Sequence, residues 1–373
     1  MVQGSPRIGS RARMNAMIEA PGTHANNGPP SLLDLPASQW REEMAKWVDA
    51  PYRADQVVDW VFRKGVYDFN EMLNLPLDLR AELARRFSVE PPSVNRSFES
   101  SDGTQRHLLG LKDGSSVEAV TMPYEDRVTL CLSSQVGCRF ACRFCQTGVM
   151  GLTRSLTAGE IVGQALRLRT ELNTPDLPVN IVFMGQGEPL DNAESVTQAI
   201  VGLQDPQGPG LSWRRITLST VGVVPEIRRL ADLGERRPRL AISLNATTDE
   251  VRSEIMPVNR KWPIRELLSA VRALPWRTRE KVTFEYVLLA GVNDQPEDAD
   301  RLGELLRGLP AKVNLIPWNE LPGLAYARPS ARAIEDFRLQ VLRRGLDALV
   351  RYSRGTDIAA ACGQLHAAVA RSG

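Results

Sequence analysis

Residues 137–145 read GCRFACRFC and hold three of the five cysteines of this 373-residue chain. Cys138, Cys142 and Cys145 have the spacing C-x3-C-x2-C. Three thiolates can hold three irons of a four-iron cluster, whereas electron-transfer clusters usually take four Cys ligands. The fourth iron then keeps a position for a non-protein ligand. The spacing therefore favours a cluster that binds and activates a second molecule.

Two other interpretations of these cysteines stay open at this stage. The spacing i, i+4, i+7 could place the thiols on one buried face of a helix, because Cys packs as a small hydrophobe. Gly137, Arg139 and Arg143 fit a loop better than such a face. A zinc site completed by a distant fourth ligand is also compatible with the spacing.

Composition is typical of a soluble globular protein, with 43% apolar and 24% charged residues. No apolar run reaches the length of a membrane span. Clustered cysteines indicate metal or redox chemistry in a reducing cytoplasm, so we expect a cytoplasmic protein. The net charge of +2, from 46 basic and 44 acidic residues, neither demands nor excludes a nucleic-acid partner.

The pattern of apolar residues divides the chain into five parts. We expect a disordered tail (1–30), an N-terminal helical accessory domain (31–94), a β-hairpin linker (95–125), a barrel domain (126–355) and a C-terminal segment (356–373). The hairpin is indicated by the turn residues Asp113 and Gly114 between two apolar runs.

Strands and helices alternate within the barrel domain. The expected strands are 128–132, 180–184, 215–219, 240–244, 282–289 and 313–316. Thr157 and Glu160 have the spacing of a capping box, and Ser330 and Gly345 bound a later helix. Six βα units predict an α/β fold with a parallel sheet curved into a partial (β/α)6 barrel, two units short of a closed TIM barrel.

Polar segments follow these strands, where active sites of such folds collect. Beyond the cysteine loop they are GQGEP at 185–189, Ser219-Thr220, Ser243-Leu244-Asn245 and PWN at 317–319. Each segment alone is a weak signal, since glycine-rich loops often only turn the chain. Together they predict one cofactor site at one end of the sheet.

Five segments resemble a known family over residues 31–370. They are SSQVGC (133–138), GEP (187–189), TLST (217–220), NLIPWN (314–319) and DIAAACGQL (357–365). With the cysteine loop, they resemble the RlmN/Cfr family of radical S-adenosylmethionine (SAM) RNA methyltransferases, and within it the RlmN branch. The resemblance implies a radical SAM barrel fold.

The resemblance also implies an activity. RlmN-type enzymes methylate carbon 2 of one adenine in the peptidyl-transferase region of 23S rRNA and of the adenosine at position 37 of certain tRNAs. The expected cofactors are one [4Fe-4S] cluster on the three clustered cysteines and two SAM molecules per turnover. The expected partners are the two RNAs and an external electron donor such as flavodoxin, with a monomeric enzyme and no membrane. The alternatives are a Cfr-like carbon-8 methyltransferase and a non-catalytic, metal-stabilised RNA-binding protein.

By the same resemblance three further residues act in catalysis. Cys362 accepts a methyl group as S-methylcysteine, loses a hydrogen to the 5′-deoxyadenosyl radical, and adds to the adenine. Cys131 resolves the protein–RNA crosslink through a transient disulfide with Cys362. Glu118 is the proton acceptor.

The implied SAM contacts are Gly187, Glu188, Ser219, Ser243, Leu244, Asn245 and Asn319. Two positions depart from the family pattern, with Gln186 where many members have Met and Asn245 where many have His. Trp318 and Tyr326 are candidates for stacking on an RNA base, and packing within the protein is an equal alternative for Trp318. The helical domain is interpreted as a reader of RNA shape.

Overall fold

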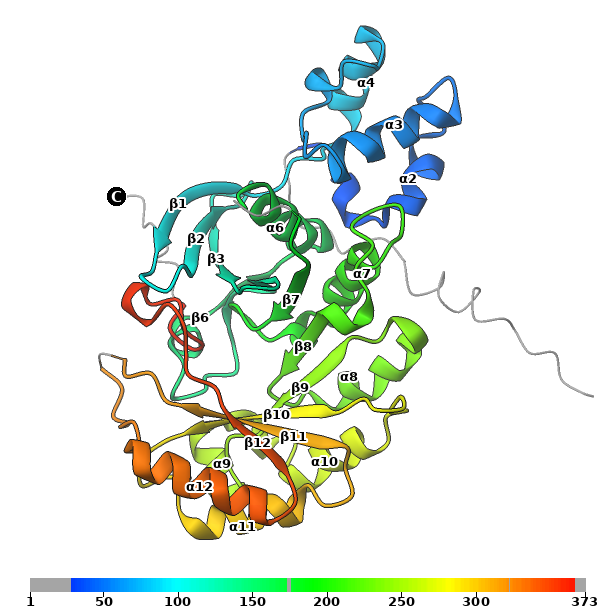
Figure 1. The fold of residues 1–373 in the computed structure, drawn as a ribbon. Coiled ribbons are helices and arrows are strands. Elements are labelled where there is room, and N and C mark those ends of the chain that lie inside the picture. The colour runs from blue at the N-terminus through cyan, green and yellow to red at the C-terminus, as the bar shows by residue number, and fades with distance from the viewer. Residues whose placement is uncertain (1–27, 173–175, 322, 366–373) are drawn as a thin grey trace, which may run out of the picture.

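The computed structural model of the chain describes residues 28–172, 176–321 and 323–365. Figure 1 shows a curved sheet with helices along its outer side and a small helical module beyond one end. The expected disordered tail lies outside the described residues, apart from residues 28–30. Residues 366–373 of the expected C-terminal segment also lie outside them.

Ten strands form one sheet, hydrogen-bonded in the order β1-β2-β3-β4-β7-β8-β9-β10-β11-β12. Their bounds are β1 Ser93–Glu99, β2 Gln105–Gly110, β3 Ser116–Pro123, β4 Val128–Cys131, β7 Val179–Phe183, β8 Ile216–Thr220, β9 Arg239–Ser243, β10 Val282–Leu288, β11 Ala311–Pro317 and β12 Asp347–Val350. The strands from β4 onward pair in parallel, which confirms the six predicted strands. The sequence pattern missed β12, which pairs with β11 and adds a seventh parallel strand.

The helices alternate with these strands as the pattern predicts. Their bounds are α2 Ala37–Met44, α3 Pro51–Phe62, α4 Leu77–Arg86, α5 Gln146–Met150, α6 Ala158–Thr170, α7 Ala193–Leu203, α8 Val224–Arg229, α9 Asp249–Ile255, α10 Ile264–Arg272, α11 Pro296–Leu305 and α12 Ala331–Arg343. In the described part of the chain, no helix combines the length and the apolar character needed to cross a membrane.

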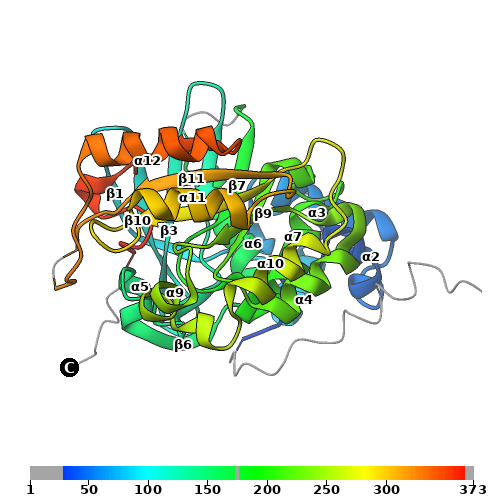
Figure 2. The same cartoon turned by 90° about the horizontal axis from the view of Figure 1, so that it is seen from below.

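Two helix starts confirm the capping signals in the sequence. Thr157 and Glu160 form a complete capping box at α6, with each side chain accepting from the other's backbone N–H. The Ser330 side chain accepts from Ala333 N at the start of α12. The apolar faces of α6, α10 and α12 are buried, and Figure 2 shows α10, α11 and α12 packed along the strands from below.

The sheet stays open, because its strand order is linear and ends at β1 and β12. This confirms a partial barrel. The predicted hairpin at 95–125 is the antiparallel β2–β3 pair, and β3 continues the sheet by pairing with β4. The segment therefore extends the barrel sheet, since the outer edge of β4 has backbone groups that need partners.

The helical module docks on α6 and α7 and begins with a 3-10 turn, Leu32–Asp34. Gly159 N at the start of α6 donates to Asp34 Oδ1 over 2.6 Å, and Gln198 of α7 donates to Asp34 O over 2.7 Å. In Figure 1 the module projects beside these two helices. Trp40 and Leu83 form part of its own buried core.

Candidate active site

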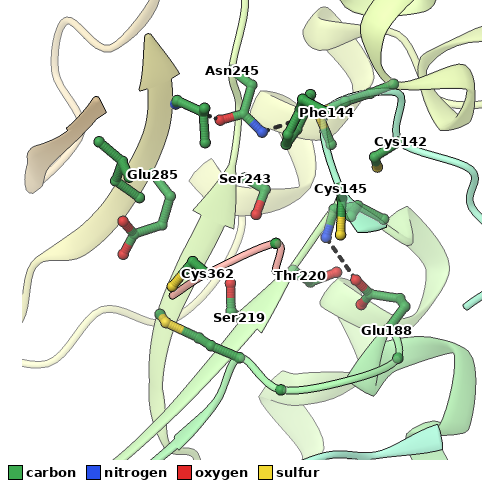
Figure 3. A pocket seen from close by; sticks show the side chains of 18 of the residues that line it. Cys142, Phe144, Cys145, Glu188, Ser219, Thr220, Ser243, Asn245, Glu285 and Cys362 are labelled. Carbon is green, nitrogen blue, oxygen red and sulfur yellow. Dashed lines mark hydrogen bonds between the residues drawn. The ribbon is translucent and has the colours of Figure 1, made fainter. Parts of the chain in front are cut away.

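One cavity lies at the carboxyl ends of β7 to β11 and has a volume of about 160 Å³. We call it the acidic cavity; Figure 3 shows the side chains around it. It is lined by Cys142, Phe144, Cys145, Phe183, Met184, Gly185, Gly187, Glu188, Pro189, Ser219, Thr220, Val221, Ser243, Asn245, Met256, Glu285, Val287, Ile316, Trp318, Asn319, Cys362 and Gly363. Eight segments of the chain thus meet at the end of the sheet that the strand pattern predicts.

The three clustered cysteines lie on a loop. Cys138 ends the short strand β5 (Gln135–Cys138), and Cys142 and Cys145 precede α5. The helical-face interpretation is therefore wrong for these residues. The ribbon of β5 with β6 (Gly151–Ser155) requires Gly137, whose φ is +81° and whose added Cβ would lie 1.9 Å from Gly151 O.

The environment of the three thiols suits a metal cluster. Burial raises the pKa of Cys138 to about 12 and raises the pKa of Cys142 and Cys145. The negative charge of a neighbouring Cys145 thiolate adds to the shift at Cys138 and at Cys142. Coordination to a metal keeps such thiols deprotonated, because the cation replaces the lost solvation. In the part of the chain that the structure describes, no three His, Cys, Asp or Glu groups converge on a single metal ion. Cluster thiolates each bind a different iron and need no such convergence.

Glu188 lies at the base of the acidic cavity, and its carboxylate is held from two sides. Oε1 accepts from Leu190 N over 3.0 Å, and Oε2 accepts from Val221 N over 2.8 Å. Burial raises the pKa of Glu188 to about 7 in spite of these hydrogen bonds. A buried carboxylate of this kind is complementary to a cationic ligand group.

Gly187 forms the close approach between the Gly-Glu segment and the strand of the cysteine loop. Its φ is +98°, and an added Cβ would lie 2.6 Å from Gln135 Cβ. Gln135 Oε1 accepts from Glu188 N over 2.9 Å and so fixes the register of the two segments. The cavity rim therefore needs glycine at this position.

The other predicted SAM contacts differ in whether they line the cavity and in whether their side chains are free to bind a ligand. Ser219, Ser243 and Asn319 line the cavity at the ends of β8, β9 and β11. Leu244 does not line it, since its side chain is fully buried in the core. Asn245 lines it with φ +57°, but its side chain accepts from Val287 N over 2.8 Å and donates to Met256 Sδ over 3.2 Å.

The sequence analysis assigned no role to two buried polar residues at this site. Glu285 lines the acidic cavity, and in the described structure its Oε2 has no hydrogen-bond partner. Burial raises its pKa. Arg252 is buried and donates to the carbonyls of Val221, Ser243 and Leu244, which fixes the ends of β8 and β9. A lone acid in the otherwise apolar strand 282–288 was the available signal for Glu285.

The donor set of the acidic cavity fits a cationic cofactor beside an iron–sulfur cluster. Its charged lining consists of Glu188 and Glu285, and no Lys or Arg belongs to its described lining. SAM carries an ammonium and a sulfonium group, which this pair of carboxylates would neutralise. The serine hydroxyls and Asn319 add the hydrogen-bonding groups that a ribose or carboxylate needs.

A second cavity of about 290 Å³ adjoins the first, and we call it the basic cavity. It is lined by Val120, Met122, Tyr124, Cys131, Val182, Met184, Ile316, Val350, Arg351, Tyr352, Ser353, Arg354, Ala360, Ala361, Cys362 and Leu365. Its described lining contains two arginines and no acid. Met184, Ile316 and Cys362 line both cavities, so these three residues form the wall between them.

The segment that carries Cys362 is anchored at two ends. Toward the cysteine loop, Gln146 N donates to Gly363 O over 2.7 Å and Thr147 Oγ1 donates to Leu365 O over 2.8 Å. Toward the β1–β2 turn, Ser100 Oγ donates to Asp357 Oδ1 over 2.5 Å. The segment thus crosses the open side of the sheet, as the red ribbon in Figure 1 shows.

The two outlying cysteines face the same cavity. Cys131 is buried at the end of β4, whereas Cys362 is exposed to the cavities. All cysteines of the described chain are free thiols. Burial raises the pKa of Cys131 to about 12, and desolvation by the surrounding cavity walls raises the pKa of Cys362. The positive charge of Arg351 opposes both shifts.

Glu118 is buried on β3 and forms an ion pair with Arg106. Its backbone N–H donates to Gln186 Oε1 over 3.1 Å, and its carbonyl accepts from Ser133 Oγ over 2.6 Å. Val120 and Met122, two and four residues further along the strand, line the basic cavity. Side chains alternate along a strand, so Glu118 points to the same side of the sheet as these two residues but does not itself line the cavity.

The structure gives Trp318 a packing position. Its side chain is buried, its Nε1 donates to Phe144 O over 3.1 Å, and its ring packs edge-on against Tyr326 at 5.8 Å. The exposed aromatic ring at the basic cavity is Tyr352, which is 60% exposed.

Comparisons with known proteins agree with this fold and site. Residues 132–303 match the radical SAM superfamily, whose members use SAM and a [4Fe-4S] cluster, and residues 31–89 match the ribosomal RNA large subunit methyltransferase N-terminal domain. The chain is 48% identical to the dual-specificity RNA methyltransferase RlmN of Anaeromyxobacter dehalogenans over 344 residues, which cover 91% of this chain and 92% of that protein.

Two further relatives support the same assignment. RlmN of Dinoroseobacter shibae is 49% identical over 332 residues, covering 86% of this chain and 84% of that protein. The crystal structure of a radical SAM methyltransferase from Sphaerobacter thermophilus superposes with a TM-score of 0.87 at 44% identity, covering 91% of this chain and 99% of that one. Because the identity extends over nearly the whole of each chain, the protein belongs to the RlmN family of radical SAM RNA methyltransferases.

Proposed function

We propose that this protein methylates carbon 2 of adenine in 23S rRNA and in tRNA, with Cys362 as the carrier of the methyl group. The observation that carries the proposal is the position of Cys362 in the wall between two cavities of opposite charge. From that position one thiol can receive a methyl group on the acidic side and deliver it on the basic side. The relatives' shared description as dual-specificity RNA methyltransferases supports the two substrate classes.

The acidic cavity would hold SAM. Glu188 would receive its ammonium group, and Ser219, Ser243 and Asn319 would hydrogen-bond its ribose or carboxylate. Cys138, Cys142 and Cys145 would hold the cluster, which together with SAM supplies the reductive formation of the 5′-deoxyadenosyl radical. The protein's part is to orient these groups and to exclude water from them.

Cys362 would act twice in each turnover. Its thiolate first takes a methyl group from one SAM, and the methyl carbon later forms the bond to adenine after losing a hydrogen atom. Cys131 would then attack the Cys362 sulfur, so that a disulfide forms as the carbon–sulfur bond breaks. The electron pair of that bond would pass to the methylene carbon, which takes up a proton to become the methyl group of the product. An external thiol reductant would return the disulfide to two thiols. Support for this pairing comes from the common cavity that both cysteines line.

Glu118 would remove the ring proton at the attacked carbon. Its orientation toward the side of the sheet that carries the basic cavity supports this role. Its ion pair with Arg106 holds the carboxylate in place on the strand.

A comparison of two cysteine variants on one RNA fragment tests the proposal. Cys362→Ala should abolish methyl transfer while iron content and SAM binding stay normal. Cys131→Ala should accumulate a covalent protein–RNA adduct, visible on a denaturing gel, because the resolving thiol is missing. Normal turnover by both variants would refute the methyl-cysteine route.

The position of the methyl group is tested separately. The modified RNA should yield 2-methyladenosine on nuclease digestion, identified by retention against synthetic standards. An 8-methyladenosine product would instead support a Cfr-like carbon-8 activity.

A further inference from the structure

Arg351 lines the basic cavity together with Cys131 and Cys362. It follows β12 directly, and its backbone N–H donates to Leu315 O over 2.8 Å. Its guanidinium charge acts on Cys362, on Cys131 and on Glu285 across the shared wall. Arg351 therefore shares the basic cavity with both thiols and acts on them electrostatically.

The guanidinium of Arg351 has donors that the protein uses little. In the described structure its side chain has one hydrogen bond, from Nη1 to Met184 Sδ at 3.9 Å, and thioether sulfur is a weak acceptor. The neighbouring Arg354 differs, since it donates to Pro123 O and Asp102 O and pairs with the Asp102 carboxylate at 3.3 Å. Arg351 thus offers several N–H groups to a ligand in the cavity.

We propose that Arg351 donates a hydrogen bond to a ring nitrogen beside carbon 2 of the target adenine and thereby turns that carbon toward Cys362. The inference rests on the proposed function. Carbon 2 lies between N1 and N3, and both nitrogens are acceptors in an unpaired adenine. The methyl group on Cys362 must reach carbon 2. Both ring nitrogens are bonded to that carbon, so they come close to Cys362 in the cavity that Arg351 also lines.

The same geometry disfavours a phosphate at Arg351. With the base against Cys362, the phosphates of that nucleotide lie farther from the thiols, on the side of the solvent-exposed Tyr352. A donor beside carbon 2 also withdraws electron density from the attacked carbon and favours addition of a carbon radical.

A double-substitution experiment tests the contact. Reconstituted wild-type and Arg351→Gln proteins, already methylated on Cys362, react in single turnover with an RNA stem-loop that carries adenosine, 1-deazaadenosine or 3-deazaadenosine at the target. Arg351→Gln should slow transfer to adenosine about 10- to 100-fold, the effect of losing a charged hydrogen bond. One of the two analogues lacks the nitrogen that accepts the hydrogen bond from Arg351. With that analogue, Arg351→Gln should react as fast as the wild type.

For each substrate, the rate of the wild type is divided by the rate of the variant. This ratio does not depend on the intrinsic reactivity of the altered base. Arg354→Gln is the matched control and should slow all three substrates by one common factor. Arg351→Lys, which keeps a cation and a donor, should recover part of the rate on adenosine alone. Iron content and Cys362 methylation, measured by mass spectrometry, confirm that the variants are folded.

Two results would overturn the inference. If Arg351→Gln slows adenosine and both analogues equally, Arg351 contacts no ring nitrogen. If Arg351→Gln slows all three substrates equally and also lowers the salt dependence of RNA affinity, Arg351 contacts a phosphate. Absence of product from the wild type with adenosine RNA would refute the proposed function itself, which is a different outcome.

Discussion

The acidic and basic cavities share a wall and differ in almost every other respect. The acidic cavity is built from the ends of parallel strands and carries Glu188 and Glu285, whereas the basic cavity lies between the two ends of the open sheet and carries Arg351 and Arg354. Opposite charges suit opposite ligands, namely a cationic cofactor and a polyanionic RNA. The difference indicates that an open barrel lets one thiol serve two ligands that could not share a single pocket.

The two cavities also differ in how they are held together. Around the acidic cavity, buried groups such as Arg252 tie neighbouring strand ends through backbone carbonyls. The basic cavity is closed by residues 354–365, which are anchored at the β1–β2 turn, at the end of β3, at Asn319 and at the cysteine loop. The cofactor side is therefore rigid, and the RNA side depends on a few contacts.

The largest effect is expected from removing a cluster ligand, which should disable the acidic cavity and leave RNA binding at the basic cavity intact. Cys142→Ala should reduce bound iron to background and abolish SAM cleavage, because two thiolates cannot replace three. RNA affinity should stay within about twofold, since the basic cavity contains none of the cluster cysteines. Iron analysis and a gel-shift titration measure the two quantities. A parallel loss of RNA affinity would show that the cavities are not independent.

The next effect concerns the rim of the acidic cavity. Gly187→Ala should lower the free energy of unfolding by about 3 kcal/mol, from left-handed strain and the clash with Gln135. Gly114→Ala is the matched control, since φ there is +82° with no atom within 4 Å, and should cost about 1 kcal/mol. Urea unfolding of both variants measures the difference. Equal costs would mean that the rim can relax around a methyl group.

The pH dependence of stability should reveal the buried acid of the same cavity. The pKa of Glu188 is about 7 when folded and 4.5 in the reference state, so the folded protein binds more protons between these values. The free energy of unfolding should therefore fall as pH rises through this window, by about 3 kcal/mol at most. Glu188→Gln should flatten the dependence in cluster-free protein. An unchanged pH profile in the variant would assign the titration to another group.

The smallest expected effect concerns the mouth of the basic cavity. Tyr352→Ala should weaken RNA binding about 10-fold without changing stability, because an exposed ring offers a stacking surface for a base. Tyr352→Phe keeps the ring and should bind normally. SAM binding should be unchanged in both variants. If Tyr352→Ala binds RNA as tightly as the wild type, the base stacks elsewhere.

Much of the barrel could be predicted because its signals are local. The six predicted strands are runs of β-branched and aliphatic residues bounded by polar segments, and periodicity alone identifies such runs. Strand β12 was missed because Asp347–Val350 is only four residues long and its edge position exposes Leu349. The sequence left both packing and base stacking open for Trp318, and the structure shows packing, since exposure of a tryptophan depends on what packs over it.

The sequence by itself determined the chemistry that this protein can hold. The cysteine spacing, the Gly-Glu segment and the polar residues after each strand indicate a cluster and a cofactor at one end of a parallel sheet, because those signals depend only on residue type and spacing. Only the tertiary structure decided that Cys131, Cys362 and Arg351 meet in one cavity. They come from β4, the C-terminal segment and the end of β12, and contacts between segments more than 200 residues apart depend on strand order and on the anchoring of residues 354–365.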